Sequence, residues 1–305
     1  MAEIALLMER LETAMADVGP DACRIFHGRG GVDEAWKHVV IDWYRPALLV
    51  TLYADRENSA DWLTQLQTMA EQHEKIECLL VQRRYQAGAP VERIFGEAPE
   101  QATESGLSYQ LSLEKNQNHG FFPDMKPGRD WLRERAAGKR VLNLFAYTCA
   151  LSVAAVQGGA QQVVNLDQSS RSLAVGRENH RLNFPPERCR SVRYLAHDLF
   201  KSWGRLKRLA PFDLVVLDPP SHQPGSFVAV KDYPRLLRRL PEVLAEKAEV
   251  LACLNAPELD DTFLTELFAE HLPQAKFSGI LPQPTGYEEA EAGRRLKRLV
   301  YRLEG

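Results

Sequence analysis

Three polar residues lie at or near the ends of apolar runs that predict buried strands. They are Asn143, Asp167 and Asp218. In an open α/β sheet, ligands bind outside the carboxyl ends of the strands. We therefore expect these three side chains to face one crevice, where the two carboxylates could accept hydrogen bonds from a ligand.

The first of these strands leads into a tight bend at residues 145–149 and then into a helix. Asp167 lies 24 positions after Asn143, close to the spacing of about 20 residues at which a strand–helix–strand unit places the carboxylate that binds an adenosine ribose. The bend lacks the G-x-G-x-x-G pattern that lets backbone approach the pyrophosphate of a dinucleotide. S-adenosylmethionine (SAM) has no pyrophosphate, so we predict SAM. The alternative is an ordinary strand–helix–strand unit in which Asp167 caps the next helix.

The strand that ends at Asp218 continues into two prolines, Pro219 and Pro220, and then into Ser221 and His222. Proline has no backbone N–H, and its ring stiffens the chain. A rigid group of acceptors without donors suits the amine or ring N–H of a nucleobase, and His222 could stack on that base. The alternative interpretation of this motif is a turn that follows a strand.

Two further residues have two interpretations each. Asp198 follows the third predicted strand, where it could accept from an adenine amino group or cap the helix that comes next. Cys253 ends the fifth predicted strand, where it could be a nucleophile or a small apolar filler. Its neighbours Leu251, Ala252 and Leu254 are apolar, and apolar burial makes a thiol inert. We favour the filler.

Predicted strands and helices alternate from about residue 139 onward, which indicates a parallel sheet covered on both faces. The last two predicted strands, at residues 275–281 and 296–303, leave no room for a helix and should be antiparallel neighbours. The predicted fold class is α/β, with a seven-stranded Rossmann-like sheet of the methyltransferase type and a smaller N-terminal α/β module. We expect the module at residues 1–104, for substrate or RNA binding, and the catalytic domain at 105–305. Residues 96–106 are interpreted as a linker.

Composition limits the possible classes. The 305 residues are 45% hydrophobic and 26% charged, with a net charge of −3. They contain no apolar run of the roughly 18 residues that a membrane helix needs. The five cysteines are scattered without C-x-x-C spacing, which argues against a metal site and favours a reducing cytoplasm. A nucleic-acid partner would have to bind a local basic patch. The oligomeric state is not predicted.

Four motifs together resemble the bacterial large-subunit (23S) ribosomal RNA base methyltransferases, which are class I SAM-dependent enzymes. The motifs are Asn143-Leu144-Phe145-Ala146-Tyr147-Thr148, Asp167, Asp218-Pro219-Pro220 and Gly120-Phe121-Phe122-Pro123-Asp124. The resemblance covers about residues 105–305 well and implies that Asp124, Phe145 and Tyr147 line the SAM pocket, with Asp167 on the ribose and Asp198 on the adenine. The predicted cofactor-binding residues are Asp124, Asn143, Phe145, Ala146, Tyr147, Thr148, Asp167 and Asp198. The predicted catalytic residues are Asp218, Pro219, Pro220 and His222.

The sequence departs from this family at two motif positions. Lys126 stands where the family usually has an arginine, and His222 stands where it usually has a phenylalanine. The family's usual extra RNA-binding domain at the N-terminus is not expected in these residues. The departures affect the predicted substrate more than the predicted cofactor.

The predicted function is SAM-dependent methylation of a base in large-subunit ribosomal RNA. Members of the family make 5-methylcytosine or 7-methylguanosine, and we favour a guanine nitrogen because carbon 5 of cytosine needs an activating thiolate. One alternative is a methyltransferase for a protein or small molecule, which the acidic net charge favours. The other is a catalytically silent SAM-fold protein that binds RNA or a ribosomal subunit as an assembly factor.

Overall fold

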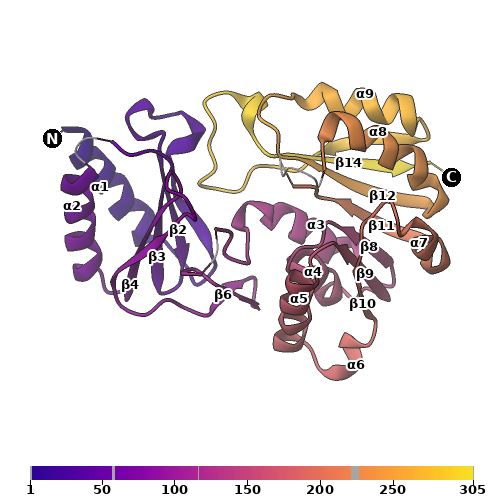
Figure 1. The fold of residues 1–305 in the computed structure, drawn as a ribbon, viewed down its shortest axis with the longest axis horizontal. Coiled ribbons are helices and arrows are strands. Elements are labelled where there is room, and N and C mark those ends of the chain that lie inside the picture. The colour runs from indigo at the N-terminus through magenta and orange to yellow at the C-terminus, as the bar shows by residue number, and fades with distance from the viewer. Residues whose placement is uncertain (1, 57–58, 116, 221–226, 305) are drawn as a thin grey trace. The chain divides into compact units, whose positions relative to one another are not determined.

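The computed structural model describes the chain except for residues 1, 57–58, 116, 221–226 and 305 (Figure 1). The chain forms two compact units. Unit 1 comprises residues 1–124 and 284–291, and unit 2 comprises residues 125–283 and 292–305. The division predicted from the sequence, after residue 104, stays a prediction. Among the described residues, no helix combines the length and apolar character needed to cross a membrane.

Unit 1 is built on a five-stranded sheet with the order β1-β2-β3-β4-β5. Neighbours are antiparallel except β3 and β4, which are parallel. Every residue of β2 and β3 is buried, because apolar side chains of the two helices pack with the sheet in one core. The elements are α1 (Ala2–Ala16), β1 (Cys23–His27), η1 (Gly28–Gly30), η2 (Glu34–Trp36), β2 (Val39–Tyr44), β3 (Ala47–Leu52), α2 (Ser59–Gln72), β4 (Cys78–Arg83) and β5 (Val91–Phe95).

A two-stranded hairpin follows, where the sequence was interpreted as a linker. Strand β6 (Gln101–Glu104) pairs with β7 (Leu107–Gln110). The two residues between them, Ser105 and Gly106, both have positive φ, 52° and 74°, as in the tight turns that match the twist of a hairpin. The linker prediction was wrong because the polar composition of this stretch concealed a Ser-Gly turn.

A segment from the C-terminal part of the chain, residues 284–291, completes unit 1. The ring of Tyr287 is buried and lies under the guanidinium of Arg24, with 4.3 Å from the carbon to the ring centroid. Glu289 Oε1 lies 3.1 Å from His27 Nε2, and the N–H of Ala290 donates to the carbonyl of Gly30 at 2.8 Å. The chain thus leaves unit 2, packs against β1 and η1, and returns.

Unit 2 contains the predicted seven-stranded sheet, with the order β10-β9-β8-β11-β12-β14-β13. The neighbouring strands β10, β9, β8, β11 and β12 are all parallel, and β14 is antiparallel to both of its neighbours, β12 and β13. The expected antiparallel pairing of the last two strands is confirmed. The strands are β8 (Arg140–Leu144), β9 (Gln162–Asp167), β10 (Val192–Ala196), β11 (Phe212–Leu217), β12 (Leu244–Leu254), β13 (Ala275–Ile280) and β14 (Lys297–Leu303).

Helices cover this sheet. Apolar residues of α7, α8 and α9 share one large core with β8, β9, β11 and β12, and α8 and α9 lie side by side (Figure 1). Helix α7 begins at Trp203, whereas the sequence predicted a helix from Asp198 to Arg208. Helices α8 and α9 were not predicted. The helical elements are η3 (Pro123–Met125), α3 (Lys126–Arg135), α4 (Ala150–Gln157), α5 (Ser170–Asn183), α6 (Pro186–Cys189), α7 (Trp203–Leu209), α8 (Ala229–Arg239), η4 (Leu240–Glu242), α9 (Asp261–His271) and η5 (Ala292–Arg294).

The strand register brings the predicted site residues to one edge of the sheet. Leu144 at the end of β8 pairs with Leu166 of β9 on one side and with Leu217 of β11 on the other. The three strands therefore end level with one another. Asp167 and Asp218 directly follow the paired residues, and both belong to this carboxyl edge.

Candidate cofactor and substrate site

The bend after β8 is held in a strained backbone conformation. Phe145, Tyr147 and Cys149 have φ values of 60°, 46° and 60°, in the left-handed region that non-glycine residues seldom occupy. Such conformations persist only where the surroundings fix them, and they cluster at ligand sites. Here the N–H of Ala146 donates to the carbonyl of Leu166 at 3.0 Å, and the N–H of Cys149 donates to the carbonyl of Ala146 at 2.7 Å.

The carboxylate of Asp167 fixes the same bend from the neighbouring strand. Its Oδ2 accepts from the N–H of Tyr147 and its Oδ1 from the N–H of Ser169, both at 2.8 Å. Each carboxylate oxygen has a second lone pair, so a half-buried Asp167 can accept two hydroxyls as well. The N-cap of α5 is Ser169, which accepts from the N–H of Ser172. Helix α5 is therefore capped by Ser169 and not by Asp167.

Asn143 lies beneath the bend in a chain of buried hydrogen bonds. Its Nδ2 donates to Oδ1 of Asn165 at 3.0 Å, and Nδ2 of Asn165 donates to Oγ of Ser152 at 3.0 Å. Ser152 and Nε2 of His180 are 2.9 Å apart, and Nδ1 of His180 is 2.7 Å from the carbonyl of Gly176. The carbonyl can only accept, so Nδ1 donates and Nε2 accepts from the serine hydroxyl. This network joins β8 and β9 to α4 and α5.

The network keeps His180 neutral. Burial lowers the pKa of this imidazole to about 4, and a second ring proton would leave the Ser152 hydroxyl without its acceptor. Sequence reasoning did not find Ser152, Asn165 or His180, because they are far apart in the chain. The alternation of strand β8 does predict that Asn143 points to a face of the sheet. Its assignment as a direct SAM contact stays a prediction.

Helix α5 packs tightly against the bend at Gly176. A Cβ added at Gly176 would lie 2.4 Å from the Cys149 Sγ and 2.9 Å from its Cβ, which real Cβ atoms do not tolerate. Burial, with Asp167 as a smaller cause, raises the pKa of the Cys149 thiol well above its usual value. Three residues after Gly176, Nδ2 of Asn179 donates to the carbonyl of Thr148 at 2.9 Å. Cys149 is thus a packing residue.

The edge at β11 offers a different chemistry. Asp218 is half-buried, Pro219 is buried and Pro220 is half-buried, and neither proline carries an N–H. Phe145, which follows β8, packs edge to face on Phe227 at 5.0 Å between centroids, and Phe227 packs on Tyr233 at 5.3 Å. His222, the predicted stacking residue, lies outside the described residues.

The Tyr233 hydroxyl donates to the carbonyl of Cys253, so it is fixed beneath this edge. Burial raises its pKa well above the usual value, and Cys253 and Asp218 add to the shift. Cys253 is 1% exposed in β12. All five cysteines are among the described residues, and the two in or beside the catalytic strands, Cys149 and Cys253, are buried.

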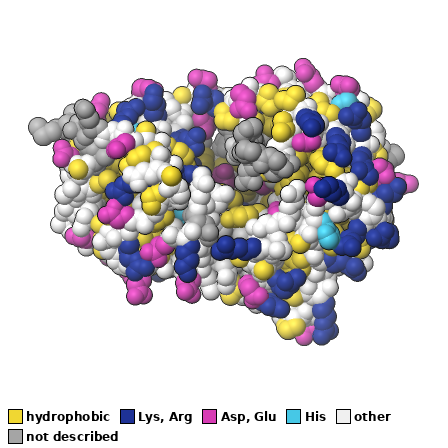
Figure 2. Space-filling view, viewed as in Figure 1, with side chains coloured by type: hydrophobic (Ala, Val, Ile, Leu, Met, Phe, Trp, Pro, Cys, Tyr) yellow, Lys and Arg dark blue, Asp and Glu magenta, His cyan; other side chains and the backbone are white. Residues whose placement is uncertain are grey.

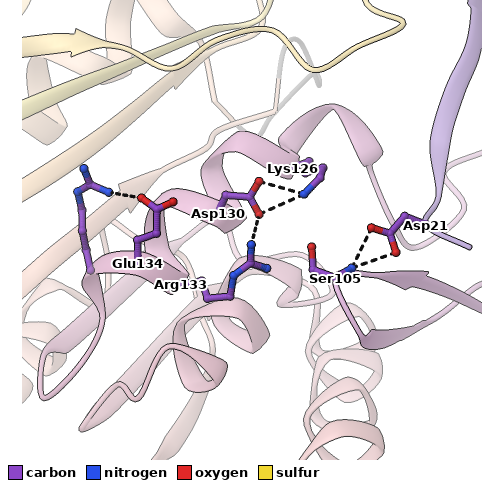
Figure 3. Close-up of polar contacts among 7 residues, drawn as sticks. Asp21, Ser105, Lys126, Asp130, Arg133 and Glu134 are labelled. Carbon is purple, nitrogen blue, oxygen red and sulfur yellow. Dashed lines mark hydrogen bonds and ion pairs between the residues drawn. The ribbon is translucent and has the colours of Figure 1, made fainter. Parts of the chain in front are cut away.

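The surroundings of Asp198, a predicted site residue, and of Lys126, which replaces the family's usual arginine, are defined in the structure. Oδ1 of Asp198 accepts from the N–H of Lys201 at 2.9 Å, which caps the turn before α7. The contact of Asp198 with the adenine stays a prediction. Lys126, at the start of α3, donates to both oxygens of Asp130 at 3.0 and 3.3 Å, and Arg133 donates to the same carboxylate (Figure 3). Asp124 is the last residue of the N-terminal part of unit 1, and its contact with SAM stays a prediction.

Comparison with known proteins identifies the family. A family model described as S-adenosylmethionine-dependent methyltransferase matches residues 23–302. The chain belongs to this family. It is thus a SAM-dependent methyltransferase, and the cofactor predicted from the bend and Asp167 is confirmed. Among the described residues, no group of three or more His, Cys, Asp or Glu side chains could hold a metal ion.

Relatives of this methyltransferase include proteins named for ribosomal RNA. The YwbD protein of Bacillus subtilis, provisionally named a ribosomal RNA large subunit methyltransferase, is 33% identical over 254 residues, 77% of this chain and 61% of that protein. Ribosomal RNA large subunit methyltransferase I of Aeromonas hydrophila is 33% identical over 132 residues, 42% of this chain and 33% of that protein. The chain thus spans less than two thirds of the length of either relative.

A solved structure has the same fold. A protein from Streptococcus mutans, provisionally named a SAM-dependent methyltransferase, superposes with a TM-score of 0.83 at 24% identity over 98% of this chain and 81% of that one.

The donors and acceptors at the edge fit SAM. The cofactor's ribose hydroxyls and adenine amine are donors, and Asp167 and Asp198 are acceptors at the ends of neighbouring strands β9 and β10. When bound, SAM supplies the electrophilic methyl group of its sulfonium.

Proposed function

We propose that this methyltransferase modifies a base of large-subunit ribosomal RNA. The observation that carries the proposal is the pairing of two unlike sites on adjacent strands. β8 and β9 supply the SAM bend and Asp167, and β11 supplies Asp218 and two prolines at the same level. An edge of acceptors beside a methyl donor suits a planar group that presents N–H donors. The names of two relatives point to the same RNA.

The target atom we propose is a guanine nitrogen. A ring nitrogen with a lone pair needs only alignment with the methyl group, while carbon 5 of cytosine needs a thiolate that adds to the ring. Cys253 is 1% exposed and Cys149 is fully buried under the bend, so neither thiol is placed for that addition. In this mechanism Asp218 and nearby carbonyls orient the base, and the site acts by positioning. The enzyme would work in the cytoplasm, where its RNA is.

The proposal is tested with tritiated SAM. Ribosomal RNA from a strain that lacks the gene and from its parent are incubated with the purified protein, and the labelled nucleosides are identified. We expect label only in large-subunit RNA of the deletion strain, in a methylguanosine. Label in 5-methylcytidine would overturn the atom assignment. Tight SAM binding without transfer to free RNA or to ribosomal subunits would instead favour a silent assembly factor.

A further inference from the structure

Basic side chains gather on the outer surface of α7 and α8. The name α7–α8 surface is used below for the exposed residues Lys201, Arg205, Lys207, Arg208, Lys231, Arg235 and Arg238. Figure 2 shows Lys and Arg side chains crowded over this part of unit 2. In a chain with a net charge of −3, such a local excess of one sign creates a positive potential that the whole molecule does not have.

Most of this charge is not neutralised within the protein. Lys207 pairs with Glu242 at 2.8 Å, and the other six side chains make no ion pair with a carboxylate of the described residues. The undescribed residues 221–226 contain no Asp or Glu. Elsewhere in unit 2, Lys126 and Arg133 share Asp130, and Arg295 pairs with Asp261. The α7–α8 surface therefore has charge available for a partner.

Aromatic residues hold two guanidinium groups of the same helix in place. Arg235 lies over the ring of Phe200 at 3.8 Å, and Arg239 lies over Trp203 at 4.9 Å. Nη1 of Arg239 also donates to the carbonyl of Phe200 at 3.4 Å. A stacked guanidinium has lost part of its side-chain freedom before binding and still presents N–H groups at its edge, which suits paired contacts with phosphate oxygens.

The position of the surface connects it to the crevice. Lys201 lies between β10 and α7, and Lys231 lies in the first turn of α8, in the connection from β11 to β12. Both connections begin at the carboxyl edge where Asp218 stands. The basic residues then continue along α7 and α8 away from that edge.

We propose that the α7–α8 surface binds the phosphate backbone of the RNA that flanks the target base. This inference rests on the proposed function. Phosphate contacts supply most of the affinity and fix the register of a nucleic acid, while the crevice selects the base. A polyanion that is anchored along α7 and α8 would reach the crevice at the end where Lys201 and Lys231 lie.

The test removes three charges that make no aromatic stack, in the variant Arg205→Gln/Arg208→Gln/Arg238→Gln. The probe is an unmodified transcript of large-subunit ribosomal RNA, and its affinity is measured over a series of salt concentrations. We expect affinity to fall by roughly tenfold or more and the slope of log affinity against log salt to fall by about 2. SAM affinity should not change, which also shows that the variant is folded.

A matched control removes three exposed arginines from a different part of unit 2, in Arg171→Gln/Arg190→Gln/Arg193→Gln. We expect it to keep the parent's RNA affinity within about twofold. Equal losses of RNA affinity in the two variants, or an unchanged RNA affinity in the first variant, would overturn the inference. Methylation of RNA by the parent would still support the proposed function in that case. A third outcome separates the two hypotheses: the parent methylates no RNA, but the first variant alone loses RNA binding. The proposed function would then be wrong, and the role of the α7–α8 surface in RNA binding would be supported.

Discussion

The strand ends at β8 and β11 lie side by side, yet they are built in opposite ways. After β8, backbone N–H groups of Ala146, Tyr147 and Cys149 are all engaged, and Asp167 holds the bend from β9. After β11, Pro219 and Pro220 have no N–H to engage. One end is thus a preformed backbone loop, and the other is a stiff set of acceptors.

This difference separates the two tasks of a methyltransferase. A cofactor is always the same molecule, so a loop fixed in one strained conformation can be complementary to it without rearrangement. A substrate must be told apart from similar bases, and acceptors without donors reject a base edge that presents the wrong pattern, because buried polar groups are then left unpaired. The following predictions test whether the two ends act independently.

The largest effect is expected at Asp218. Asp218→Ala should lower methyl transfer by roughly 10²–10³-fold, the size found when a positioned polar group is removed from an active site. SAM affinity, measured by calorimetry, should stay within about twofold if Asp218 acts on the substrate, as we propose. If transfer and SAM affinity fall by similar factors, the two ends are not separate, and Asp218 belongs to the cofactor pocket or to folding.

A smaller loss is expected at the cofactor end. Asp167→Ala removes the acceptor for the N–H groups of Tyr147 and Ser169 and the acceptor that we propose for the ribose, and should weaken SAM binding by about 1–3 kcal/mol. Asp260→Ala is the control, because Asp260 caps α9 through the N–H groups of Thr262 and Phe263 and its loss affects stability alone. A SAM affinity of Asp167→Ala equal to that of the parent would falsify the role given to this carboxylate.

The hydrogen-bond network beneath the bend predicts a sensitivity to acid. The pKa of His180 is about 4 in the folded protein and 6.5 in the unfolded chain. The unfolded chain therefore binds more protons between these values, and stability falls as the pH falls through this window. Between pH 7.5 and 5.0 this residue should account for about 2 kcal/mol of lost stability.

Urea unfolding of the parent and of His180→Gln at both pH values measures this contribution. The parent should lose more stability than the variant, and the difference cancels contributions from other histidines such as His38 and His119, whose pKa values burial also lowers. An equal pH dependence in the two proteins would show that His180 is not the titrating group of the network.

The smallest effect is expected at Cys253. Cys253→Ala should keep most of the activity, and RNA that contains 5-fluorocytidine should form no adduct that survives SDS. The reason is that Cys253 is buried in β12, where its carbonyl accepts from Tyr233 and its thiol is inaccessible. A trapped adduct that disappears in Cys253→Ala would show instead that the enzyme methylates carbon 5 of cytosine.

Much of unit 2 could be predicted from the sequence because parallel strands and helices alternate, and each strand is a short apolar run. The level ends of β8, β9 and β11 follow from that pattern. Helix α8 could not be recognised in the same way, because Pro234 lies inside it and its surface is densely charged. The hairpin β6–β7 was concealed by a polar composition.

The candidate site, like the fold, could be predicted from the sequence only in part. The spacing from Asn143 to Asp167, which reflects one strand–helix–strand unit, together with the missing G-x-G-x-x-G glycines was enough to predict SAM. The contact between Ser152 and His180 joins two helices, and no spacing in the sequence reports that they are adjacent. His222 remains a prediction from the sequence, because it lies outside the described residues.

The insertion of residues 284–291 into unit 1 has a consequence for biosynthesis. Domains generally fold as units during synthesis, beginning at the N-terminus. Here Tyr287 and Glu289 complete the packing of β1 and η1, so unit 1 is not complete until residues 284–291 have been synthesised, after most of unit 2. Strand β14, which lies between β12 and β13, emerges later still. A nascent chain that stalls before residue 284 therefore has neither unit complete.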